Sequence, residues 1–294
     1  MKVKKALITA AGWGTRFLPI TKSQPKEMLP LLNKPLLQYS VEEAIACGAE
    51  LIVIVSSRGK RSIEDYFDRH SELERLLEHS GQTELLREVQ RPCEMADICY
   101  VRQKEQLGLG HAVLTAKRII GNEPFMLFLP DDLFQQRERV VQNMVQIYEQ
   151  TQGSVVAVKR VSRVEVSRYG IINPKYITDR VHRIMGLIEK PKAENSPSDL
   201  AIMGRYVLSP EIFDALENTP PGRNGEIQLS DALQSLLPYH PVYAYEFEGD
   251  RYDTGTLPGW LETMVSFALE DPRIGPNFRE RVTAMLSEIP AVPV

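Results

Sequence analysis

The stretch ITAAGWGTRFLPITKSQPKEMLP, residues 8–30, begins with the last two residues of the short apolar run KKALIT at residues 4–9. Small residues and glycines let the backbone approach a ligand and expose successive N–H groups, which form a nest for anions such as phosphate. Two cations of the stretch, Arg16 and Lys26, are placed to neutralise a polyphosphate. The candidate nucleotide contacts of this loop are Ala10, Ala11, Gly12, Gly14 and Thr15.

The loop does not match two other phosphate-binding patterns. No GKS or GKT follows it, so it is not a Walker A motif. The third glycine of the dinucleotide fingerprint is replaced by Phe17, and Pro19 prevents a helix from starting smoothly there. A dinucleotide-dependent oxidoreductase would also carry an acid after its second strand, where this chain has Ser56, Ser57 and Arg58. We therefore disfavour the oxidoreductase alternative.

The first half of the chain alternates between strand and helix patterns. Residues 51–57, LIVIVSS, form a continuous β-branched run, which is typical of a strand buried on both faces of a parallel sheet. Apolar runs and helical periods alternate in the order strand, helix, strand, helix, strand, helix, strand, which predicts a parallel sheet with helices on both faces. The expected strands are 4–9, 51–57, 98–103 and 125–132, and the expected helices are 35–47 (ended by Gly48), 61–79 and 111–120.

The second half predicts more strands with turns between them. The expected strands are 154–161, 169–174, 182–191, 200–209 and 242–249, and the expected helices are a Ser-Pro start at 209–210 and the segments 226–237 and 257–271. Ligand sites of open α/β sheets lie beyond the carboxyl ends of the strands, where the 8–30 loop also lies. We predict one α/β domain over residues 1–270, with a Rossmann-like, mostly parallel mixed sheet flanked by helices and an inserted mixed β lobe.

Composition excludes several classes of protein. The 294 residues carry a formal net charge of −4, which argues against a nucleic-acid scaffold or a polybasic membrane binder. The longest apolar runs are too short to span a bilayer, and the apolar part of the N-terminus is too short for a signal peptide. Cys47, Cys93 and Cys99 form no CxxC motif and imply no disulfide framework, so we expect a cytoplasmic protein. Metal ligation by Cys93 and Cys99 is the less favoured alternative to half-buried thiols.

Further motifs follow the loop in a fixed order. They are VRQKEQLGLGHAV (101–113), FLPDD (128–132), RYGII (168–172), LIEKPKAENSPSDLAIMGRYVLSPEIF (187–213), TPPGRNGEIQLSDAL (219–233) and YDTGT (252–256). With GTRFLP and PKEMLP, this combination resembles the sugar nucleotidyltransferases over about residues 3–270, and specifically the bacterial UTP–glucose-1-phosphate uridylyltransferases. The resemblance implies a nucleotide-diphospho-sugar transferase fold and Mg²⁺-dependent transfer of a uridylyl group from UTP to glucose 1-phosphate, giving UDP-glucose and pyrophosphate.

The resemblance also divides the chain. It implies a nucleotide-binding half at about residues 1–135, a sugar-binding half at about 136–256, and a C-terminal helical segment at 257–294. Members commonly form homodimers or homotetramers, so this last segment is a possible oligomer contact. On the nucleotide side, the matching Gln103 and Gly108 contact the uracil; a glutamine amide can both donate to and accept from a pyrimidine edge. We expect His111 to start a helix and not to act as a catalyst.

Two aspartates are the candidate metal ligands. Asp131 ends an apolar strand and Asp253 lies in YDTGT, far away in sequence. Mg²⁺ prefers oxygen donors and is commonly held by one or two carboxylates plus phosphates; the resemblance implies that these two residues hold it. Asp132 departs from the family pattern, in which an apolar residue is common, and is expected to be a neighbour of the site or a group that supports its ligands from outside.

The sugar-side candidates follow from the resemblance. It implies that Glu189 accepts hydrogen bonds from glucose hydroxyls, that Lys190 holds the sugar phosphate, that Gly170 lets the sugar approach the backbone, and that Glu226 gives sugar-side support. Adjacent strand residues point to opposite faces, so Glu189 and Lys190 can serve one ligand only where the strand is irregular, as Pro191 suggests. Without the resemblance, a surface ion pair is the simpler interpretation.

The implied reaction needs no nucleophile from the protein. The sugar phosphate is itself an anionic nucleophile, and Arg16, Lys26 and Lys190 would act catalytically by offsetting the repulsion between two polyanions. A thymidylyltransferase, or a uridylyltransferase for another sugar 1-phosphate, remains the alternative: YDTGT is familiar from thymidylyltransferases, whereas PKEMLP and EIQL favour the uridylyl form. A non-catalytic nucleotide-sugar-binding regulator would be expected to lose the aspartates or the cations, which this chain keeps.

Overall fold

The main body of the protein is one nine-stranded sheet. The computed structural model describes residues 1–222 and 225–288. The strands of the sheet are β1 (Lys5–Thr9), β4 (Leu51–Ser56), β5 (Asp97–Arg102), β6 (Phe125–Phe128), β8 (Ser154–Arg160), β9 (Gly170–Tyr176), β10 (Val181–Glu189), β11 (Leu200–Leu208) and β12 (Val242–Glu246). Their order is β5-β4-β1-β6-β11-β8-β12-β10-β9. Strands β5, β4, β1 and β6 are parallel, as their continuous apolar runs predict.

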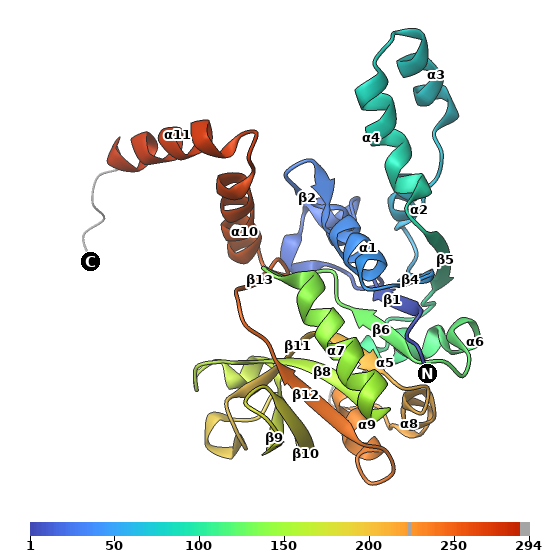
Figure 1. Ribbon diagram of the computed structural model, residues 1–294, viewed down its shortest axis with the longest axis vertical. Coiled ribbons are helices and arrows are strands. Elements are labelled where there is room, and N and C mark those ends of the chain that lie inside the picture. Colours follow the sequence, from blue (N-terminus) through green and yellow to red (C-terminus); the bar gives the residue numbers. More distant parts are fainter. Residues whose placement is uncertain (223–224, 289–294) are drawn as a thin grey trace.

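The strands of the second half extend this sheet. Strand β11 lies between β6 and β8 and is antiparallel to both. Strand β12 is parallel to β8, whereas β10 is antiparallel to β12 and β9 is antiparallel to β10. The expected α/β class with a mixed sheet is confirmed, and Figure 1 shows the two halves joined along one sheet.

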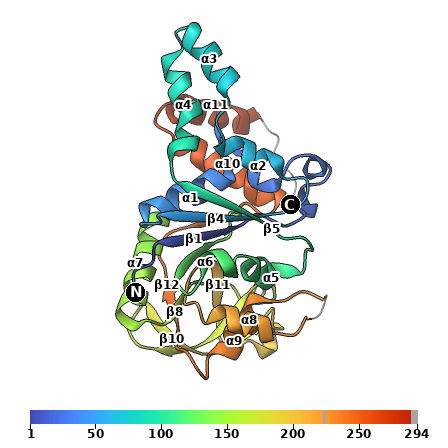
Figure 2. The same ribbon diagram turned by 90° about the vertical axis from the view of Figure 1, so that its right-hand side faces the viewer.

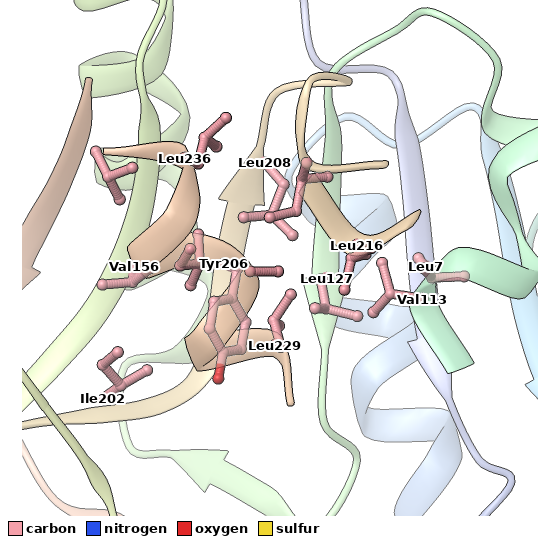
Figure 3. Close-up of a cluster of buried hydrophobic side chains, with 14 of the residues drawn as sticks. Leu7, Val113, Leu127, Val156, Ile202, Tyr206, Leu208, Leu216, Leu229 and Leu236 are labelled. Atoms are coloured by element: carbon pink, nitrogen blue, oxygen red, sulfur yellow. The ribbon is translucent and has the colours of Figure 1, made fainter. Parts of the chain in front are cut away.

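Helices cover both faces of the sheet. The helices are α1 (Leu36–Ala46), α2 (Arg61–Phe67), α3 (Ser71–His79), α4 (Thr83–Glu94), α5 (Gly108–Thr115), α6 (Lys117–Ile120), α7 (Arg137–Thr151), α8 (Ile212–Asn218), α9 (Leu229–Leu236), α10 (Leu257–Glu270) and α11 (Gly275–Glu288). Side chains alternate along each strand, so Leu7 of β1 packs in a core with α5, α8 and α9 (Figure 3), while Ala6 and Ile8 pack with α1, α2 and α7. Each face therefore has its own apolar core.

Two helices were not predicted from the sequence, and one predicted helix is divided. The segment 61–79 forms α2 and α3, because Asp68 adopts an extended conformation after α2 and the His70 side chain accepts a hydrogen bond from Leu73 N–H at the start of α3. Helix α4 was missed because it is polar, mostly exposed and contains Pro92. Helix α7 is the second missed helix; it buries only four of its fifteen residues.

Several boundaries also differ from expectation. The helix expected at 111–120 begins earlier, at Gly108, so His111 lies within α5 and does not start it. The helix expected at 226–237 begins at Leu229. The strand expected at 125–132 ends at Phe128, and a separate short strand, β7 (Asp132–Phe134), follows. Gly48 follows the end of α1 with a φ of 91°, as expected for a helix stop.

Two helical projections leave the body. Helices α3 and α4 form one, and α10 and α11 form the other, with α11 starting at the end of α10 and running away from it (Figures 1 and 2). The three cysteines are free and half-buried. Among residues 1–222 and 225–288, no helix has the length and apolar character needed to cross a membrane.

Candidate active site

A short two-stranded ribbon brings the two candidate metal ligands together. Strand β13 (Arg251–Asp253) pairs antiparallel with β7, and Asp253 lies opposite Asp132. The backbone N–H and hydroxyl of Thr254 both donate to the carbonyl of Asp131, at 2.8 and 2.9 Å. A Cβ built on Gly255 would lie 2.9 Å from Asp131 Oδ2 and 3.1 Å from Asp253 Oδ1, so the two carboxylates flank one small space.

Cations surround this aspartate pair. Lys26 Nζ lies 2.5 Å from Asp131 Oδ2, and Arg16 Nη1 donates to the carbonyl of Gly255 at 3.0 Å. Burial alone lowers the pKa of Lys26, but the Asp131 carboxylate more than offsets this and the pKa is raised. Burial alone raises the pKa of Asp131, but Lys26 brings that pKa below its ordinary value. Both groups are therefore charged at neutral pH.

The glycine-rich loop starts where β1 ends. Ala10 N–H donates to the carbonyl of Val55 at 2.8 Å, which fixes the start of the loop against β4. Gly14 has a φ of 67°, and its carbonyl accepts the Thr21 hydroxyl at 2.8 Å. A side chain at Gly12 would meet nothing within 4 Å, so this part of the backbone is open to a ligand.

The expected uracil contacts lie where two distant segments meet. Gln103 is buried, and its Nε2 lies 3.1 Å from the carbonyl of Gly108 and 3.0 Å from His111 Nδ1. Gly108 has a φ of 93°, and a Cβ there would lie 2.8 Å from Cβ of Glu226. Glu226, which the sequence placed on the sugar side, thus lies beside the expected base contacts. Arg223 and Asn224 of the same motif lie outside the described residues.

The sugar-side candidates lie close together at the ends of β9 and β10. Gly170 pairs with Glu189, and a Cβ on Gly170 would lie 3.1 Å from Glu189 Oε2. Lys190 has a φ of 46°, and its Nζ lies 3.1 Å from Glu189 Oε1. The irregularity that turns both side chains to one side is therefore the left-handed backbone of Lys190 itself.

One cleft of about 650 Å³ contains both groups of residues. Its lining includes the sequence candidates Arg16, Asp131, Gly170, Glu189, Lys190 and Asp253. The structure does not bring every candidate into this cleft. Gly12 and Thr15 line a separate hollow of about 590 Å³ on the glycine-rich loop. Gln103, Gly108 and Glu226 line neither of these two spaces.

Sequence reasoning placed Asp132 beside the site but missed the arginines that support the aspartates. Asp132 is buried and accepts from Gly204 N–H at 2.8 Å and from Arg251 Nε at 2.6 Å. Burial raises the pKa of Asp132, and Arg251 opposes that rise. Arg168 Nη2 lies 3.4 Å from Asp253 Oδ2. The sequence motifs could have identified both arginines, because Arg168 is the first residue of RYGII and Arg251 immediately precedes YDTGT.

The donor set is suited to a hard divalent cation. Asp131 and Asp253 supply carboxylate oxygens, and Mg²⁺ commonly completes its octahedral coordination with water and substrate phosphates. Within residues 1–222 and 225–288, no cluster of three or more His, Cys, Asp or Glu side chains could form a metal cage by itself. Two carboxylates leave most of the octahedral positions of such a cation to water and substrate phosphates.

Known proteins resemble this chain over most of its length. A nucleotidyl transferase family model matches residues 5–268. UTP–glucose-1-phosphate uridylyltransferase 1 of Staphylococcus saprophyticus is 51% identical over 92% of this chain and 94% of its own. A UDP-glucose pyrophosphorylase complexed with UDP-glucose has a TM-score of 0.82 at 44% identity, over 92% of this chain and all of its own. A UTP-bound UGPase from Acinetobacter baumannii has a TM-score of 0.89 at 38% identity, over 96% of this chain and 99% of its own. The chain therefore belongs to the nucleotidyl transferase family, in which it groups with the UTP–glucose-1-phosphate uridylyltransferases.

Proposed function

We propose that this protein transfers a uridylyl group from UTP to glucose 1-phosphate in a Mg²⁺-dependent reaction that gives UDP-glucose and pyrophosphate. The observation that carries the proposal is one cleft in which Asp131, Asp253 and Arg16 face Glu189 and Lys190. A UDP-glucose pyrophosphorylase complexed with UDP-glucose and a UTP-bound UGPase share this fold at 44% and 38% identity. A triphosphate and a sugar phosphate can thus be held in one space.

The nucleotide side combines the loop with cations. The backbone at Ala10, Ala11, Gly12, Gly14 and Thr15 would hold the triphosphate. Arg16 and Lys26 would screen its charge, and Gln103 with Gly108 would contact the uracil. These assignments are supported by the open backbone at Gly12 and by the position of Lys26 against Asp131. When bound by Asp131 and Asp253, Mg²⁺ would supply charge neutralisation and Lewis acidity at the phosphates.

The sugar side would position the attacking group. Glu189 would accept hydrogen bonds from glucose hydroxyls, with Gly170 leaving room for the ring, and Lys190 would hold the sugar phosphate near the triphosphate. Glu226 would support this arrangement from the base-side loop. An oxygen of the sugar phosphate would bond to the α-phosphorus of UTP, and the bond from that phosphorus to the leaving oxygen would break as pyrophosphate departs. Positioning and charge screening suffice for such a transfer.

Pyrophosphate release tests this proposal directly. With UTP, glucose 1-phosphate and Mg²⁺, we expect one pyrophosphate for each UDP-glucose formed, and we expect a chelator such as EDTA to stop release. Parallel reactions contain dTTP, CTP or galactose 1-phosphate. Turnover with dTTP but not with UTP would replace the base assignment with the thymidylyl alternative. Binding of a nucleotide sugar without any turnover would instead favour a non-catalytic, nucleotide-sugar-binding regulator.

A further inference from the structure

A buried ion pair lies directly beside the cations of the candidate active site. Glu27 follows Lys26 in the short 3-10 turn η3 (Lys26–Met28), and Lys60 immediately precedes α2. Lys60 Nζ donates to Glu27 Oε2 at 2.8 Å. The two side chains are only 9% and 1% exposed. This Glu27–Lys60 pair joins the turn that carries Lys26 to the body of the protein.

Folding stability alone does not explain the buried Glu27–Lys60 pair. Burial raises the pKa of Glu27 and lowers the pKa of Lys60, and each partner opposes the shift of the other. Glu27 Oε1 is buried and has no hydrogen-bond partner among the described residues. Buried ion pairs often contribute no more stability than apolar residues of the same volume. A role in placing another group is therefore a better explanation of the pair.

The geometry points to Lys26 as that group. The turn η3 packs against α2, and its backbone closes through Leu29 N–H to the carbonyl of Lys26 at 3.1 Å. Consecutive residues of this tight turn point in different directions, so a tether on Glu27 fixes the direction of Lys26. Lys26 in turn reaches 2.5 Å from Asp131 Oδ2.

Electrostatics add a second requirement. Glu27 is the hydrogen-bonded partner of Lys60, so without it Lys60 would be a buried cation that has lost its partner beside the turn that carries Lys26. Glu27 neutralises Lys60 and leaves Lys26 as the ammonium facing Asp131. We propose that Glu27 and Lys60 are positioning residues, which set the place of Lys26 for the triphosphate of the nucleotide substrate. This inference rests on the proposed function.

Kinetics of three variants test the role. We expect Glu27→Gln and Lys60→Met each to lower kcat/KM for UTP at least tenfold, while KM for glucose 1-phosphate stays within twofold. The double variant Glu27→Gln/Lys60→Met removes both charges, so we expect its thermal midpoint to return close to wild type while kcat/KM for UTP remains low. Glu74→Gln is the matched control: it removes a buried, paired carboxylate in α3, and we expect wild-type kinetics.

Two results would overturn the positioning role. One is an unchanged kcat/KM for UTP in folded single variants. The other is a double variant that regains wild-type kinetics together with stability, since that is what a purely structural pair predicts. The double variant decides the question if the single variants do not fold.

Phosphate binding separates this inference from the proposed reaction. If the wild-type protein does not turn over UTP and glucose 1-phosphate, the proposed reaction is refuted but the positioning role is not. Calorimetry with inorganic tripolyphosphate should still show binding to wild type and at least tenfold weaker binding to Glu27→Gln. Equal affinities, or no binding to wild type, would contradict the positioning role.

Discussion

Lys26 and Asp131 are 105 positions apart in the chain, yet their side chains form an ion pair. Motif content identified both residues because cations near a glycine-rich loop and acids at strand ends are recognisable types. Arg168 and Arg251, the partners of Asp253 and Asp132, were not identified. Those contacts depend on the pairing of β7 with β13, and strands of three residues are too short to show a periodicity. At this scale, residue types were predictable and their contacts were not.

The metal carboxylates can be tested singly. We expect Asp253→Asn to reduce turnover by roughly a hundredfold or more, because it removes a charge that would bind the divalent cation at the reacting phosphates. The thermal midpoint should change little. Asp250→Asn is the control, since Asp250 has a side chain that is 74% exposed and lies only three residues away. Normal activity of Asp253→Asn would exclude the ligand role.

Strands with a continuous apolar run could be predicted from the sequence, whereas a polar helix and an irregular loop could not. Buried strands such as β4 and β6 were predictable because continuous β-branched and apolar runs have few alternatives. Helix α4 is mostly polar and exposed, and its position depends on contacts with α2 and α3. The bent course of the chain around Asp132 is likewise a tertiary effect, because Asp132 is held by Gly204 and Arg251 from distant strands.

Gly204 in β11 tests how tightly this region is packed. A Cβ at Gly204 would lie 2.6 Å from Asp132 Oδ2, and Arg251 prevents that carboxylate from moving away. We expect Gly204→Ala to lower the free energy of unfolding by about 1–3 kcal/mol, measured by urea titration. A Cβ at Gly186 in β10 would lie 3.6 Å from its nearest atom, so Gly186→Ala should leave the free energy of unfolding nearly unchanged. Equal effects of the two substitutions would show that Asp132 is not fixed.

At the scale of the whole molecule, alternation predicted the sheet and both helical layers. The direction in which α10 and α11 leave the body was not predictable. It depends on the loop after β13 and on the junction at Gly275, the one buried residue of α11 among the described positions 275–288. Leu257, Leu261 and Val265 recur at intervals of four along α10 and are 51%, 49% and 41% exposed. Such a spacing places them on one face of the helix.

This apolar face predicts self-association. We expect sedimentation velocity to show a homodimer or homotetramer, and Leu261→Glu to shift the population towards monomer because it places a charge in the contact. Glu262→Gln is the control on the neighbouring, polar position. A wild-type monomer at every protein concentration would contradict the expected oligomer.

The central claim is that one cleft holds the reacting phosphates and the sugar between the aspartates and the cations. A crystal structure with UDP-glucose and Mg²⁺ tests it most directly. The account predicts the diphosphate between Arg16 and Lys190, the cation on Asp131 and Asp253, and the glucose against Glu189. A sugar nucleotide bound elsewhere on the protein, with these side chains unoccupied, would contradict it.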